Sequence, residues 1–401
     1  MTKRTATRRT FLKGAGATLG LAAATSFTPT RFAIAANAPV KVGIMLPFTG
    51  VYASLGTNIA DALTLRIAEA GGKLGGRAVE FVKVDSEAAP PKAVDNATKL
   101  VKGKGVDFVV GPVHSGVAMA MTKVMAKSPK TIMVVPNAGA DQLTGAACAP
   151  NIFRTSFSNW QCGYCLGEEV FKHGHKKVVT LSWNYGAGKQ ITGGFSEAFK
   201  AAGGDTPRAM FVDFPSIEFQ AVLTNIAAMK PDAVFVFFAG TGAVKFVTDW
   251  AAAGLKESIP LYGAGFLTEG TTQAQGSAAE GIVTAMHYAD TLDLPANVHF
   301  LEAFREATGR AGDVYGVQGY DTGTLLVKAM EAVDGNVENT QALIKAMEAT
   351  TITNSPRGDW SLSAAHNPVQ DFYLRQVKGG KNFVTGMAAE KLRDPATGCK
   401  L

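Results

Sequence analysis

The chain has 401 residues, of which 47% are hydrophobic and 18% are charged. This length is enough for two domains with cores of their own, and the composition excludes a disordered protein. The formal charge of +6 is local, because six of the 39 basic residues and none of the 33 acidic ones lie within residues 1–37. The rest of the chain is neutral overall and gives no indication of a nucleic-acid partner.

Residues 1–35 have the pattern of an export signal. The segment TRRTFLK is followed by an apolar stretch of 14 residues and by the small-residue cleavage site AIA at 33–35. The paired Arg8 and Arg9 are typical of a twin-arginine signal. The sequence therefore predicts export to the periplasm. No later stretch reaches the roughly 18 apolar residues of a membrane-spanning helix, and we expect a soluble mature chain.

Strands and helices alternate through the first third of the mature chain. The pattern predicts strands at 40–47, 78–87, 106–112 and 131–136, and helices at 58–72, 91–105 and 118–126. Short, fully apolar strands between helices are typical of a parallel sheet that is covered by helices on both faces.

The same alternation restarts after residue 155. It predicts strands at 176–183, 231–240, 260–267, 281–288 and 370–379, and helices at 193–204, 243–254, 295–308 and 315–333. Two successive α/β blocks indicate two lobes, each with its ligand groups at the carboxyl ends of parallel strands. A cleft between the lobes would collect loops from both.

The loops at these strand ends are rich in glycine and small polar residues. Such residues let backbone N–H groups approach a ligand, and a following helix N-terminus favours an anion. Aromatic residues near the loop tips are candidates for lining a cleft, and Tyr185 is the best placed of them because glycines surround it. The others are Phe48, Tyr52, Trp160, Trp183 and Phe266.

Enzymatic chemistry finds little support in the sequence. His114 and Ser115 are adjacent, but the string VHSGV is no G-x-S-x-G elbow, and neighbouring loop residues usually point apart. No phosphate-binding glycine motif opens a helix in the mature chain, and no HExxH is present. His173 and His175 precede a strand, in a context more typical of a solvated loop than of a metal site. We expect no catalytic residue, metal or cofactor.

The four cysteines allow three connectivities. Export to an oxidising compartment favours disulfides. The sequence is compatible with a Cys148–Cys399 bridge, with Cys162 and Cys165 either bonded to each other or free. The lone CxxC is weak evidence for zinc.

The ordered set of loops resembles the solute-binding proteins of branched-chain amino-acid-type ABC transporters. VKVGIMLPFTGVYASLGTNIADAL, VDFVVGPVHSG, VVPNAGADQLT, IFRTSFSN and WNYGAGK occur in that family's order, and the similarity runs over about residues 38–390. The resemblance implies an α/β type I periplasmic binding fold with two lobes, each a mainly parallel sheet flanked by helices.

The resemblance also implies where the lobes begin and end. Three hinge crossovers are expected near residues 155–158, 284–288 and 353–360. The first lobe would comprise residues 38–156 plus 286–355, the second lobe 157–285 plus 356–390, and a C-terminal tail 391–401. The implied mechanism is hinge closure on a small ligand, followed by docking of a monomer to membrane permease and ATPase subunits.

The resemblance implies ligand-binding roles for individual residues of this chain. Ser115 and the backbone of Asn137 and Ala138 would hold a carboxylate, each at the start of an expected helix. The loop residue Leu55 and Tyr185 would wall the pocket, and Thr241 and Phe266 match positions of the second lobe. His114 would lie at the rim, and Trp160 is a further aromatic candidate.

Three departures from the family's pattern concern the ligand amine. Phe266 falls at or beside an expected acid, Asn159 replaces a second acid, and Gly139 replaces a threonine. A buried ammonium without a carboxylate would be unstable. We therefore expect an organic acid without an amino group, most of all an aromatic acid of the benzoate or phenylpropenoate type. The alternative is a branched-chain or other aliphatic amino acid, with Glu269 as the missing acid.

Overall fold

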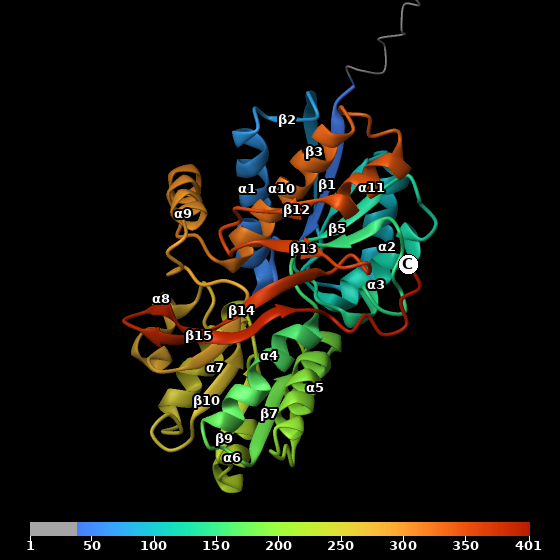
Figure 1. The fold of residues 1–401 in the computed structure, drawn as a ribbon. Coiled ribbons are helices and arrows are strands. Elements are labelled where there is room, and N and C mark those ends of the chain that lie inside the picture. Colours follow the sequence, from blue (N-terminus) through green and yellow to red (C-terminus); the bar gives the residue numbers. More distant parts are fainter. Residues whose placement is uncertain (1–37) are drawn as a thin grey trace, which may run out of the picture. The chain divides into compact units, whose positions relative to one another are not determined.

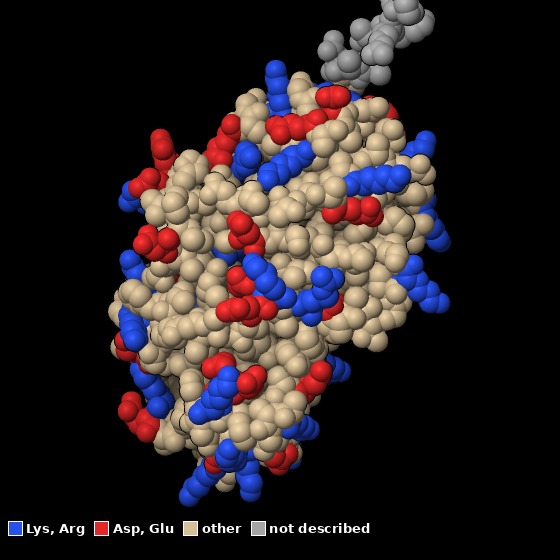
Figure 2. Space-filling view, viewed as in Figure 1, with Lys and Arg blue, Asp and Glu red and all other residues tan. Residues whose placement is uncertain are grey.

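The computed structural model of the protein describes residues 38–401, and the predicted export signal at 1–35 lies outside the described residues. Within 38–401, no helix combines the length and the apolarity needed to cross a bilayer. On the face drawn in Figure 2, basic and acidic side chains are interspersed, as the neutral charge balance of this part of the chain predicts. That face carries no continuous basic patch.

The first lobe is built on one sheet, which within residues 38–401 has the strand order β2-β3-β1-β4-β5-β6. Its neighbours pair in parallel except β2 and β3. Its strands are β1 (Val40–Leu46), β2 (Lys73–Leu74), β3 (Arg77–Asp85), β4 (Phe108–Val110), β5 (Ile132–Val135) and β6 (Ile152–Arg154). Its first helices are α1 (Ala53–Glu69), α2 (Pro90–Thr98) and α3 (Ser115–Met125).

Helices cover both faces of this sheet because successive strand residues point to opposite sides. Ile44 and Val110 pack in the cluster that contains residues of α1 and of α10 (Val314–Ala332). Met45 and Val109 pack instead with residues of α2 and α3. Figure 1 shows α1 and α10 side by side, and the two helices are in contact.

The second lobe follows β6 and is also α/β. Within the described residues its sheet has the order β12-β13-β14-β11-β10-β9-β7-β8, with β15 paired to β14. Its strands are β7 (Val178–Trp183), β8 (Ala209–Val212), β9 (Ala233–Phe237), β10 (Leu261–Ala264), β11 (Val283–Met286), β12 (Thr351–Ile352), β13 (Trp360–Leu362), β14 (Pro368–Lys378) and β15 (Lys381–Leu392). Its helices are α4 (Asn159–Lys172), α5 (Gly186–Ala201), α6 (Gln220–Met229), α7 (Gly240–Ala252) and α8 (Thr272–Gln275).

After β11 the chain returns to the first lobe. It forms α9 (Pro295–Thr308), then α10 against α1, then α11 (Thr340–Ala349), and it rejoins the second sheet through β12, β13 and β14. The predicted α/β fold with two lobes is confirmed. The lobe boundaries that the sequence suggests remain a prediction.

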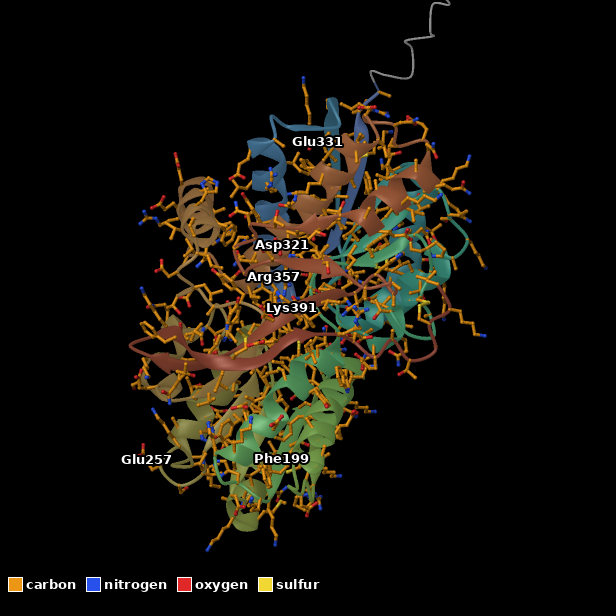
Figure 3. All side chains as sticks on the ribbon, viewed as in Figure 1. Phe199, Glu257, Asp321, Glu331, Arg357 and Lys391 are labelled. Carbon is orange, nitrogen blue, oxygen red and sulfur yellow. A yellow bond between two sulfur atoms is a disulfide. The ribbon has the colours of Figure 1, made fainter. Side chains whose placement is uncertain are left out.

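A buried ion pair joins segments that are distant in the sequence. Arg357 Nε lies 2.7 Å from Asp321 Oδ2, and both side chains are 1% exposed. Arg357 also donates to the backbone carbonyl of Thr155 at 2.6 Å, and the indole of Trp360 donates to Asp321 at 3.0 Å. Figure 3 shows Asp321 and Arg357 next to each other. Residues near 155 and near 357 are thus joined through a residue of α10.

Several elements escape the sequence prediction, and α4 is the clearest case. This helix contains two glycines, which lower local helix propensity by about 1 kcal/mol each. A Cβ on Gly163 would lie 1.9 Å from the carbonyl oxygen of Ile191, so the glycine allows α4 and α5 to pack closely. Tertiary packing therefore stabilises a helix that local helix propensity alone does not predict. Also unpredicted are α6, α11, β6 and β8.

A disulfide joins Cys148 to Cys399, while Cys162 and Cys165 are free and buried in α4. The bridge attaches the residues after β15 to the loop before β6. Cross-linking residues so far apart in sequence restricts the unfolded chain.

We expect the double variant Cys148→Ser/Cys399→Ser to lose about 2–4 kcal/mol of unfolding free energy, the usual contribution of a disulfide. Urea denaturation of the mature protein measures this loss. Wild-type protein treated with a reductant is the matched control and should behave like the variant. A variant as stable as the oxidised wild type would contradict the expectation.

Candidate functional site

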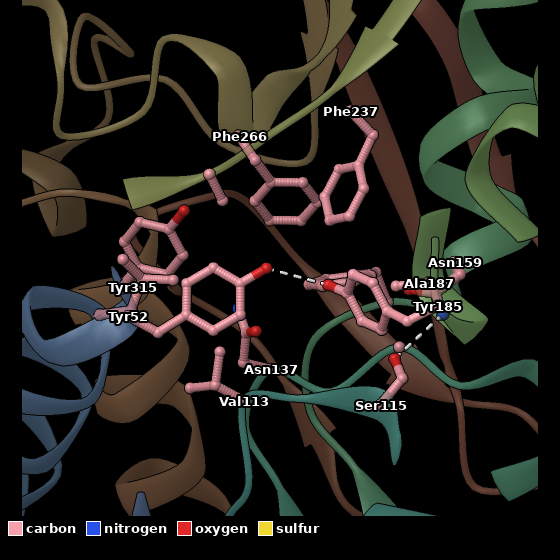
Figure 4. A pocket seen from close by; sticks show the side chains of 14 residues that line it. Tyr52, Val113, Ser115, Asn137, Asn159, Tyr185, Ala187, Phe237, Phe266 and Tyr315 are labelled. Carbon is pink, nitrogen blue, oxygen red and sulfur yellow. Dashed lines mark hydrogen bonds between the residues drawn. The ribbon is translucent and has the colours of Figure 1, made fainter. Parts of the chain in front are cut away.

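A pocket lies where the carboxyl ends of strands from both sheets meet. The space around its side chains, including the part that is open to solvent, amounts to about 310 Å³, of which only about 20 Å³ can hold the centre of a water-sized sphere. Figure 4 shows it with Phe266 and Phe237 on one side and Ser115 and Val113 on the other. Seven predicted site residues line it: Leu55, Ser115, Asn137, Gly139, Asn159, Tyr185 and Phe266.

Ser115 stands at the first position of α3, as the sequence predicts for a residue at a helix N-terminus. Its Oγ accepts a hydrogen bond from Asn159 Nδ2 at 3.2 Å. The same amide donates to Gln190 Oε1 at 2.7 Å, and Gln190 in turn accepts from the backbone N–H of Asp141 at 3.2 Å. Asn159 therefore orients the Ser115 hydroxyl, whose own hydrogen stays free to donate to a ligand.

His114 does not line the pocket. It is the N-cap of α3, and its Nδ1 accepts from the backbone N–H of Gly116 at 3.0 Å. Its ring stacks on Tyr185 with 4.4 Å between the centroids. Burial lowers the pKa of His114 to about 4, so the ring stays neutral and keeps the acceptor that the cap needs. His114 supports two lining residues, Ser115 and Tyr185, from behind.

Asn137 and Ala138 are not at a helix N-terminus, and that prediction is wrong. They precede a 3-10 turn of three residues, Asp141–Leu143, which is too short to present a row of aligned amides. The backbone N–H of Ala138 already donates to the carbonyl of Pro112 at 3.1 Å. The side chain of Asn137 donates to Gln318 Oε1 at 2.7 Å, which fixes Asn137 in the pocket wall.

Two further candidates lie away from the pocket. Thr241 is exposed on the first turn of α7. The indole of Trp160 stacks on Tyr164 and donates to Glu197 Oε2 at 2.9 Å. Leu55 does line the pocket, but it belongs to the first turn of α1, which begins at Ala53 and not in the predicted loop.

Two tyrosine hydroxyls face each other across the pocket. The Oη atoms of Tyr52 and Tyr185 are 2.9 Å apart, and Figure 4 marks this bond. Burial raises the pKa of both phenols well above 10, so both hydroxyls stay protonated at neutral pH. One of the two hydrogens occupies the bond between them, and the other is free to donate.

Glu269, the alternative partner for a ligand amine, belongs to a separate buried ion pair. Its Oε2 lies 2.6 Å from Arg375 Nη1, and its Oε1 accepts from the backbone N–H of Val314 at 2.7 Å. Among the described residues that line the pocket, none is Asp, Glu, Lys, Arg or His. The pocket wall is therefore apolar and aromatic, with neutral hydrogen-bonding groups.

Gly139 is held in place by close neighbours. A Cβ at this position would lie 2.4 Å from Asn159 Oδ1 and 2.6 Å from a ring carbon of Phe157. A threonine here, as in the amino-acid binders that the chain resembles, would not fit beside these two residues. The replacements at 139 and 159 are thus mutually compatible.

Half of the lining residues are not among those that the family resemblance assigns to the site. One of them, Tyr52, is among the aromatic candidates that the sequence predicts for lining a cleft, and the pocket contains it. Phe237 carried the same signal, because it is an aromatic residue near the end of an expected strand. The other five carried no signal in the sequence. The unassigned residues are Tyr52, Val113, Phe157, Ala187, Phe237, Ala239 and Tyr315.

No group of three or more His, Cys, Asp or Glu side chains within residues 38–401 is arranged to hold a metal ion. His173 and His175 instead both approach the hydroxyl of Tyr262, at 2.9 and 3.1 Å.

His114 predicts a dependence of stability on pH. Its pKa is about 4 in the fold and about 6.5 unfolded, so the unfolded chain binds more protons between these values and stability falls as pH falls. From pH 7 to pH 5 this group should remove up to about 2 kcal/mol of unfolding free energy. His114→Asn keeps a good N-cap residue and should lack this component. Urea unfolding of both proteins at several pH values measures it, and identical pH dependence would refute it.

The comparisons with known proteins agree with this architecture. The sequence profile of the family described as "Periplasmic binding protein" matches residues 39–382. A curated relative, the Leu/Ile/Val-binding protein homolog 6 of Brucella melitensis, is 32% identical over 359 residues, which cover 86% of this chain and 90% of the relative.

Solved structures are similar over nearly the whole chain. A solute-binding protein of an ABC transporter from R. palustris, in complex with benzoate, is 49% identical with a TM-score of 0.88 and covers 91% of this chain and 100% of its own. A solute-binding protein from Rhodopseudomonas palustris BisB5, in complex with 3,4-dihydroxybenzoic acid, is 30% identical with a TM-score of 0.84. The match covers 89% of this chain and 99% of that protein. The predicted family is confirmed, and the chain belongs to the periplasmic binding proteins.

Proposed function

We propose that the chain is the extracytoplasmic solute-binding component of an ABC uptake transporter and that it closes on an aromatic carboxylate. One observation carries the proposal. The pocket between the lobes is walled by aromatic rings and neutral hydrogen-bond donors and has no charged side chain in its lining.

The carboxylate would bind at Ser115. Asn159 donates to one lone pair of the Ser115 Oγ, and the hydroxyl hydrogen has no acceptor within residues 38–401. The backbone N–H of Ser115 opens the eleven-residue helix α3. Helix N-termini favour anions through free amides and the aligned peptide dipoles. The free hydroxyl hydrogen of the Tyr52–Tyr185 pair adds a second neutral donor that faces the same space.

The ring would lie among the aromatic residues of the second lobe. Phe266 packs against Phe237 edge-to-face with 5.7 Å between the centroids, and against Phe157 at 5.0 Å. Aromatic rings prefer offset or edge-on neighbours of this kind. Closing the lobes would bring these rings over a ligand held at Ser115, because the two sets of residues come from different sheets.

An amino-acid ligand is the second candidate, favoured by the Leu/Ile/Val-binding relative. Its ammonium group would need a carboxylate, and Glu269, the acid that the sequence offers for this role, is bound to Arg375. Removing Glu269 from that pair would leave a buried arginine unpaired, at a cost of about 3–5 kcal/mol. The benzoate and dihydroxybenzoate complexes of similar proteins also favour the aromatic acid.

The remaining parts of the proposal concern transport. We propose a monomer without catalytic turnover, since one chain supplies the whole pocket lining and no nucleophile–base pair lies in it. The protein would act in the periplasm and deliver its ligand to permease and ATPase subunits.

Export would use the twin-arginine signal at residues 8–9. Replacing both arginines with lysine should block export, and fractionation of cells would measure this.

A thermal-shift screen of the mature protein against benzoates, cinnamates, keto acids and amino acids tests the ligand class. We expect an aromatic carboxylate to raise the melting temperature, since ligand binding to the folded state alone stabilises it. Stabilisation by leucine or valine and by no aromatic acid would refute the proposal.

Ser115→Ala should weaken binding of the aromatic acid about 10- to 150-fold, the range for one hydrogen bond to a charged group. Isothermal titration calorimetry gives the dissociation constants. Thr241→Ala is the matched control, because it also removes a hydroxyl near a helix start but at an exposed position outside the pocket. Equal effects of the two substitutions would remove Ser115 from the site.

A further inference from the structure

One polar atom in the pocket wall has no partner in the described part of the chain. Tyr315 lines the pocket and is 1% exposed, and its hydroxyl makes no hydrogen bond with any group of residues 38–401. Buried hydroxyls are almost always paired, because an unpaired one loses its solvation without compensation. The neighbouring hydroxyls of Tyr52 and Tyr185 satisfy each other instead.

The position of Tyr315 is fixed by residues on either side of it. Asp313 caps α10 by accepting from the backbone N–H of Gly316 at 2.8 Å, and the N–H of Val314 donates to Glu269 at 2.7 Å. The Tyr315 ring stacks on Phe266 with 6.3 Å between the centroids and 24° between the planes. Because both backbone and ring are held, the hydroxyl keeps a fixed place in the pocket wall.

Tyr315 and Ser115 belong to opposite ends of this pocket. Figure 4 shows them on opposite sides of the Tyr52–Tyr185 pair, with Phe266 above the space between them. An aromatic acid whose carboxylate lies at Ser115 therefore points the far part of its ring towards Tyr315. Burial also raises the pKa of Tyr315 well above 10, so its hydroxyl is a neutral group that both donates and accepts.

We propose that Tyr315 binds a hydroxyl group on the ligand ring and makes the protein selective for hydroxylated aromatic acids over unsubstituted ones. This inference rests on the proposed function and extends it. A site with a buried hydrogen-bonding group discriminates strongly against the analogue that lacks the matching group, because the site is then left unpaired. Tyr315 is thus a specificity-determining residue.

The test measures dissociation constants by calorimetry for benzoate, 3-hydroxybenzoate and 4-hydroxybenzoate with the mature wild-type protein and with Tyr315→Phe. In the wild type, at least one hydroxybenzoate should bind about tenfold or more tightly than benzoate. In Tyr315→Phe this preference should disappear, through weaker binding of the hydroxybenzoate and unchanged or tighter binding of benzoate. A merely structural role would weaken all three ligands alike.

Tyr320→Phe is the matched control. Tyr320 lies on the same helix, and its hydroxyl donates to Glu69 outside the pocket, so the wild-type preference should remain. Two outcomes overturn the inference and leave the proposed function standing: wild-type protein that binds benzoate at least as tightly as both hydroxybenzoates, or a preference that survives in Tyr315→Phe. Binding of no aromatic acid at all overturns both.

Discussion

The buried pair of Arg357 and Asp321 is the interaction that joins three segments distant in the sequence. Arg357 lies between β12 and β13, Asp321 lies on α10, and the guanidinium of Arg357 also donates to the backbone carbonyl of Thr155, just after β6. A buried ion pair with one partner missing is strongly destabilising. Loss of either partner would therefore release the segment after β6 that leads from the first sheet into α4.

The pocket lining contains no charged side chain, and this determines which ligands it can bind. Arg375 neutralises Glu269 outside the lining, and burial keeps His114 neutral and the lining tyrosines protonated. What remains are hydroxyl groups and the backbone N–H of Ser115 at the start of α3, which can hold an anion but offer an ammonium group no counter-charge. The choice between ligands then depends on which neutral donors are still unpaired in the empty pocket, because only those gain a hydrogen bond when a ligand binds.

Much of the fold is readable from local pattern. The helices predicted at 295–308 and 315–333 match α9 and α10 to within a residue, because their apolar periodicity and their end signals agree. Predictions fail where packing outweighs propensity. Glycines lower the local helix propensity of α4 and of the first turns of α5, so the sequence does not predict these helical segments. The backbone N–H of Ala138 donates to the carbonyl of Pro112, so it is not free for a ligand as the sequence predicts. A one-dimensional pattern carries no information about such partners.

The sequence by itself determined the alternation of strands and helices, the family, the loops that would meet at the cleft, and a helix after Ser115, since these follow from periodicity, strand-end chemistry and ordered motifs. Only the tertiary structure decided which polar groups are already paired. Glu269, outside the pocket lining, meets a partner 106 residues away, whereas the hydroxyl of Tyr315, within the lining, meets none among residues 38–401. Hydrogen-bond satisfaction is a property of three-dimensional neighbours, and it is what separates a structural acid from a ligand-binding hydroxyl.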